Sequence, residues 1–150
     1  MTTMSDIETG VKAMRDIETA MIDALKGAGV FGNNIGSWAG QADELLANPK
    51  RTPSAWISYQ GATYAPRTLL GIKTAGRTES WSVLLFLSML KGLQTSADIG
   101  VYRQLAAVRW VLTGLAVNGS ELWPVGDRLI ESVNGLLVYD VRFTITINDY

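Results

Sequence analysis

Apolar residues near the amino terminus recur at intervals of three and four, which is the spacing of one face of an α-helix. Acidic residues fall in the first half of this segment and Lys26 lies at its end, the order that the helix dipole favours. Gly27 and Gly29 then interrupt the pattern. We therefore predict a helix over residues 6–27. Its apolar stripe contains Met14, Ile17, Met21, Ala24, Leu25 and Ala28.

A second stripe at helical spacing lies in the second half of the chain. Ser96 and Asp98 precede it and are residue types that commonly begin a helix, and Gly119 follows it. These signals predict a second helix over residues 98–117. Its stripe contains Val101, Leu105, Val108, Leu112 and Leu115.

Strand periodicity appears in two segments between these helices. Residues 54–65 alternate apolar and polar side chains, which is the period of two expected of a strand. Residues 78–91 contain a continuous apolar run from Val83 to Leu87, so both faces of this strand should be covered and the strand should be central in its sheet.

The carboxyl-terminal part predicts a hairpin. Residues 128–133 and 136–147 flank Asn134-Gly135, the commonest two-residue hairpin turn. In the last strand, alternate residues from Leu137 to Ile147 are apolar and should face the core. The intervening side chains should face solvent or a partner; they are Asp140, Arg142, Thr144 and Thr146.

The order of elements predicts an α+β fold with a mostly antiparallel four-stranded sheet and two helices packed on one face. Residues 30–38 read as a short strand or an irregular crossover, and residues 40–47 as two helical turns that end before Pro49. A length of 150 residues with 47% apolar content favours a single domain spanning residues 1–150.

Composition narrows the function more than any motif does. The chain has no Cys and no His, which excludes disulfides, thiolate nucleophiles, Ser-His-Asp triads and the usual zinc ligands. A net charge of -1 argues against a dedicated nucleic-acid binder. The acidic amino terminus is unlike a signal peptide, and the longest apolar run, Trp81 to Leu90, is far shorter than the ~20 residues of a spanning helix. We therefore expect no catalytic residue, no bound cofactor or metal ion, and no association with a membrane.

Two weaker patterns have ordinary explanations. The glycines of residues 27–36 lack the Gly-Lys-Ser/Thr ending of a phosphate loop and follow a helix instead of a strand, so we interpret them as a helix end and a turn. Asp43 and Glu44 are adjacent, but nothing in the spacing brings them to the other carboxylates. Solvated faces and helix starts account for these acids.

A basic segment lies between the first two long strands. Five cations and no acid fall between Pro49 and Thr78, and residues 66–80 are rich in Gly and Thr. The segment is either an ordinary solvated loop or a docking loop in which Arg67, Lys73 and Arg77 meet an acidic partner surface. We predict that residues 66–79 are poorly ordered in the free protein, and that losing the three cations changes stability by less than about 0.5 kcal/mol.

Trp110 falls off the core stripe of the second predicted helix, on the side of Arg103. An exposed Trp next to an Arg is typical of an interface hot spot, so both residues are candidates for a subunit interface. Partial burial of the indole under a loop is the alternative.

Five segments together resemble a known family, the phage tail terminator (tail-completion) proteins of the lambda U type, and within it the tail proteins of Mu-like prophages. Pro53 before an apolar strand matches the family pattern, as do Gly100 and Tyr102 at the start of the second helix. The similarity covers nearly the whole chain. The segments are DIETAMIDALKGAGVFG, PSAWISYQGATYA, SWSVLLFLSML, GVYRQLAAVRWVLTGL and RLIESVNGLLVYDVRFTI.

The resemblance implies a homohexameric ring that caps the tail tube, stops polymerisation of the tube and sheath, and forms the surface to which the head connector joins. The implied location is the virion tail, after assembly in the host cytoplasm, and DNA passes through such a ring. The resemblance carries no catalytic residues and no cofactors. The alternatives are another head-tail connector or tail component, and a small carboxylate-based enzyme or ligand-binding α+β protein.

Overall fold

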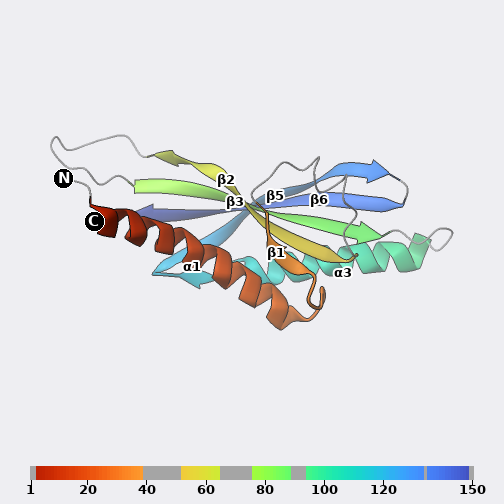
Figure 1. The fold of residues 1–150 in the computed structure, drawn as a ribbon. Helices are drawn as coiled ribbons and strands as arrows, with labels where there is room; N and C mark the ends of the chain where they lie inside the picture. Colours follow the sequence, from red (N-terminus) through yellow and green to blue (C-terminus); the bar gives the residue numbers. More distant parts are fainter. Residues whose placement is uncertain (1–2, 39–51, 65–75, 89–93, 134, 149–150) are drawn as a thin grey trace.

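A computed structural model describes residues 3–38, 52–64, 76–88, 94–133 and 135–148, and Figure 1 shows their arrangement. These residues have the predicted α+β composition. None of their helices is long and apolar enough to cross a membrane. The elements are α1 (Met4–Ala28), β1 (Ile35–Ser37), β2 (Ser54–Tyr64), β3 (Gly76–Ser88), α3 (Gln94–Leu112), β4 (Ala116–Val117), β5 (Ser120–Val133) and β6 (Leu136–Asn148).

The sheet has six strands in the order β1-β2-β3-β6-β5-β4, so the prediction of four strands is wrong. β1 pairs with β2 in parallel and all other neighbours are antiparallel. The two additional strands are only three and two residues long. A period of two cannot be recognised over such short segments. For residues 30–38 the sequence left a short strand and an irregular crossover open, and the strand is found at Ile35–Ser37.

The core lies between the helices and one face of the sheet. β3 is central, as predicted, and every residue from Trp81 to Leu87 is buried. Both helices lie on the same side of the sheet in Figure 1, which confirms the predicted layers. The side chains that meet there include Ile17, Met21 and Leu25 of α1, Val101, Leu105, Val108 and Leu112 of α3, Val83 and Leu85 of β3, and Val141, Phe143 and Ile145 of β6.

α1 agrees with its prediction to within two residues at each end. The Thr3 side chain accepts a hydrogen bond from the Asp6 backbone N–H at 3.2 Å, and the Asp6 carboxylate accepts one from the Thr3 N–H at 2.9 Å. This capping box satisfies amides that the first helical turn leaves without partners. Gly29 ends the helix in the left-handed conformation at φ 71°.

α3 ends five residues earlier than predicted. Gly114 adopts φ 78°, a conformation that favours glycine, and its N–H donates to the carbonyl of Leu122 at 2.8 Å. The chain therefore leaves the helix and turns into β4. Leu115 still packs on the core, but it does so from the turn that follows α3. Its helical spacing from Leu112 therefore did not indicate a continuing helix.

The opposite face of the sheet carries a smaller apolar cluster built on Leu84, Phe86 and Val138. The hairpin of β5 and β6 is confirmed by the pairing of Val133 with Leu136. The outward-facing side chains of β6 are less solvated than expected, because Asp140 is buried there and its carboxylate lies 3.2 Å from the Arg142 guanidinium.

Candidate assembly surface

The side of α3 that faces away from the core is exposed to solvent. Val101, Leu105 and Val108 point into the core, whereas Trp110 has 87% of its surface exposed. Arg103 is also exposed. The prediction that Trp110 lies off the core stripe is therefore confirmed, and the alternative of burial under a loop is wrong. We define the α3 surface as the exposed residues of this helix together with Thr113, which follows its last turn: Tyr102, Arg103, Ala106, Arg109, Trp110 and Thr113.

A shallow depression of about 470 Å³ lies on the α3 surface, lined by Ala106, Arg109, Trp110 and Thr113. The lining residues are spaced by three and four positions, so they follow one stripe along the helix. The short side chain of Ala106 leaves a gap beside the large indole. Such a combination of an exposed aromatic ring, an arginine and a small neighbour suits the insertion of a partner side chain.

An ion pair connects the α3 surface to the sheet. The Arg109 Nε donates to the Asp127 Oδ2 of β5 at 2.7 Å. Because about half of the Arg109 side chain is exposed, this pair contributes at most ~1 kcal/mol to stability. Its effect is to direct the Arg109 guanidinium towards β5.

β5 begins eight residues earlier than predicted and adds exposed apolar residues that the sequence did not point to. Trp123, Val125 and Leu129 are all exposed. β4 pairs with β5 only at Ser120 and Glu121, so among the described residues the outer edge of β5 has no strand partner beyond them. Pro124 and two register shifts in the pairing with β6 make β5 irregular, and such irregularities limit unwanted pairing between edges.

Arg77 does not lie in a loop, contrary to the prediction. β3 begins at Gly76, and the Arg77 Nε donates to the Glu79 Oε2 at 2.8 Å. Glu79 is 1% exposed and also accepts a hydrogen bond from the Trp81 indole at 3.2 Å. Arg77 thus pairs with an acid that the prediction overlooked. Arg67 and Lys73, like the predicted helical turns of residues 40–47, lie outside the described residues.

The pair of Arg77 and Glu79 lies next to two aromatic rings that contact each other. The rings of Tyr59 and Trp81 meet edge to face with their centroids 5.1 Å apart. Burial, and then the negative charge of Glu79, raise the pKa of the Tyr59 hydroxyl above its ordinary value. This end of the sheet is therefore a structural cluster built around a buried carboxylate.

The described carboxylates are dispersed. Asp16 accepts hydrogen bonds from Asn118 and Lys12, which lower the pKa of its carboxyl group, and Asp127 and Asp140 pair with arginines. Within the described part of the chain, no three acidic residues come together in a way that could hold a metal ion. Asp43 and Glu44 lie outside that part.

The fold is similar to solved structures. A chain from the virion of a native gene transfer agent particle superposes with a TM-score of 0.54 at 12% identity, over 88% of this chain and 94% of that one. A second solved chain, which carries no functional name, gives 0.53 at 13% identity, over 93% and 96%. At such identities the likeness concerns the fold alone. No curated protein matches the sequence. The sequence profile of the Gp37 protein family matches residues 40–148.

Proposed function

Since the chain belongs to the Gp37 protein family, we propose that it is a structural, non-enzymatic subunit of a phage-type virion. The observation that carries this proposal is the fold shared with a chain of the gene transfer agent virion. The likeness covers 94% of that chain, so it concerns a whole virion subunit. A virion subunit must contact neighbouring subunits, and the exposed α3 surface is suited to such a contact.

Within the virion, we propose that the chain is the tail terminator, a single domain that acts as a homohexameric ring on the end of the tail tube. The ring ends polymerisation of the tube and sheath and binds the head-tail connector. The sequence resemblance to tail terminators supports this finer assignment. A closed ring needs two different patches that fit each other on adjacent copies, and the α3 surface with Trp110 and Arg103 is suited to be one of them.

We also propose that Arg67 and Lys73 contribute to docking on the tube. Cations at an interface steer association and select partners more than they add affinity. Arg77 is removed from this group because it pairs with the buried Glu79.

A different component of the head-tail junction fits the same fold likeness, and one experiment separates the two roles. The purified chain is added to polymerising tail tube protein, and tube length is measured by electron microscopy. A terminator gives shorter tubes with a ring at one end. Tubes of unchanged length with bare ends would contradict the terminator role, and binding to the assembled head instead would identify a connector.

A further inference from the structure

The apolar face of α1 extends towards the amino terminus beyond the residues that the core covers. Ile17, Met21 and Leu25 are buried. Towards the amino terminus the same stripe continues with Met4, Ile7 and Val11, which are 70%, 49% and 40% exposed. We call these three residues the α1 stripe. Their spacing of three and four places them on one side of the helix.

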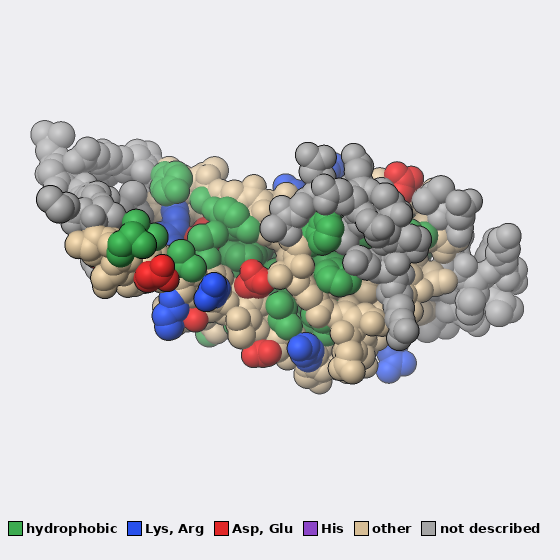
Figure 2. Space-filling view, viewed as in Figure 1, with side chains coloured by type: hydrophobic (Ala, Val, Ile, Leu, Met, Phe, Trp, Pro, Cys, Tyr) green, Lys and Arg blue, Asp and Glu red, His purple; other side chains and the backbone are tan. Residues whose placement is uncertain are grey.

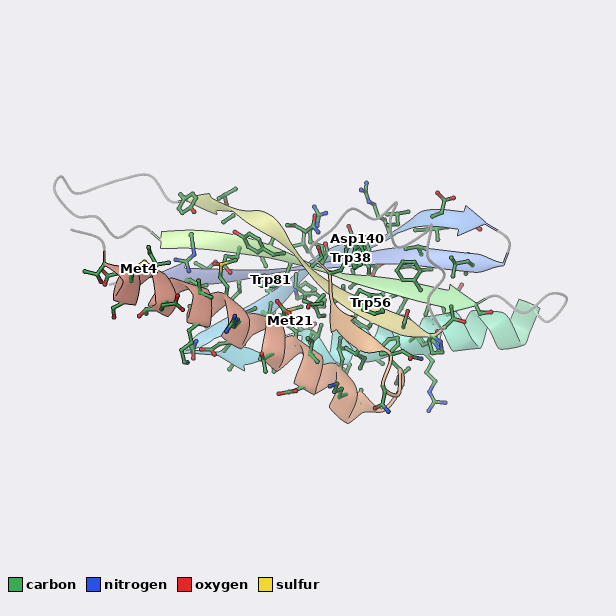
Figure 3. The ribbon with its side chains drawn as sticks, viewed as in Figure 1. Met4, Met21, Trp38, Trp56, Trp81 and Asp140 are labelled. Atoms are coloured by element: carbon green, nitrogen blue, oxygen red, sulfur yellow. The ribbon has the colours of Figure 1, made fainter. Side chains whose placement is uncertain are left out.

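The α1 stripe lies on a helical segment that has its own local supports. The capping box of Thr3 and Asp6 fixes its first turn, and Lys12 pairs with Asp16 one turn along at 3.1 Å. Figure 3 shows Met4 at the start of α1 and Met21 where the helix passes the centre of the sheet. In Figure 2, hydrophobic side chains are exposed among charged ones at the left, where α1 begins. The first turns of α1 are thus locally stabilised although the core does not cover their apolar side chains.

We propose that the α1 stripe docks on the α3 surface of a second copy of this chain. The inference rests on the proposed ring and names the two patches that form it. Helices recognised in grooves present anchors at positions i, i+3 and i+7, which is the spacing of Met4, Ile7 and Val11. On the α3 surface, the small side chain of Ala106 allows a close approach, and Trp110 provides an apolar wall.

The charges of the two patches are complementary. From Thr3 to Val11, α1 carries Asp6 and Glu8 and no cation. From Gly100 to Leu112, α3 carries Arg103 and Arg109 and no acid. Arg109 already pairs with Asp127 of β5, so the complementarity rests on Arg103. Opposite potentials across an interface favour the correct register and disfavour contacts between two identical patches. Because the patches differ, each copy binds the next head to tail, as a closed ring requires.

The lack of native cysteine allows a direct test by crosslinking. One chain carries Ile7→Cys and another carries Ala106→Cys, and the two are mixed and treated with a short bis-maleimide. We expect covalent dimers in the mixture and none from either chain alone. As a matched control, a chain with Thr63→Cys, an exposed position on β2, should give no dimer with the Ile7→Cys chain.

The outcomes separate this inference from the proposed function. Ring-sized particles that give no mixed dimer would overturn the docking of α1 on α3 and leave the ring intact; the α1 stripe would then bind another protein. Dimers of the Ile7→Cys chain with itself would indicate a two-fold contact and would also overturn the inference. Chains that stay monomeric, alone and with tube protein, would overturn both the docking and the ring.

Discussion

Replacing Arg77 with serine is expected to lower the free energy of unfolding by about 3–5 kcal/mol, because the change leaves a buried carboxylate without its ion-pair partner. Glu79 is 1% exposed, and the Arg77 guanidinium lies 2.8 Å from it. Urea unfolding followed by circular dichroism measures the loss. By comparison, the loss of an exposed loop cation changes the free energy of unfolding by less than about 0.5 kcal/mol.

Two variants serve as controls for this result. Arg67→Ser with Lys73→Ser should change the free energy of unfolding by less than about 0.5 kcal/mol, as the basic segment predicts. Arg77→Met with Glu79→Gln removes both charges and keeps an oxygen that accepts from the Trp81 indole. This variant should recover part of the lost stability, since no buried charge is left without its partner. If Arg77→Ser is as mild as the first control, the pair does not stabilise the fold.

Replacing Trp110 with serine is expected to weaken association between copies by at least ~2 kcal/mol, or about 30-fold in Kd. The indole is 87% exposed in the single chain, so the free energy of unfolding should change by less than about 0.5 kcal/mol. Sedimentation velocity over a range of concentrations measures the association, and thermal melting measures the stability.

Trp123 provides a matched control for Trp110. It is also an exposed tryptophan, at 61%, but it lies on β5 and outside the α3 surface. Trp123→Ser should leave association within a few-fold of the unchanged chain, as is usual for residues away from a hot spot. Equal losses for Trp110→Ser and Trp123→Ser would place the interface on both elements, whereas a loss confined to Trp123→Ser would contradict the role of α3.

The elements that the sequence predicted well are those with long, uninterrupted periodicity. The run from Val83 to Leu87 identified the central strand because a strand covered on both faces accommodates consecutive apolar residues. The stripe of Ile17, Met21 and Leu25 identified α1 because apolar residues four positions apart lie on one face of a helix. Trp110 was located by helical phase alone, since a residue out of step with the core stripe faces outward.

The errors have equally specific causes. Arg77 lies among Gly and Thr residues that favour a loop, but residues two apart in a strand share a face, so Arg77 pairs with Glu79. β5 was predicted too short because Trp123 and Pro124 interrupt the alternation expected of a strand. The α1 stripe was missed because Met4 and Ile7 lie among polar residues, and only the structure shows that nothing described covers them.

The ring is tested most directly by the mass of the assembled protein in solution. Light scattering is measured on the chain at tens of micromolar, alone and with tail tube protein added. We predict a single closed species, and the six-fold ring would have a mass of about 98 kDa, six times the 16.3 kDa chain. A strict monomer that forms no ring even when tube protein is present would contradict the proposal.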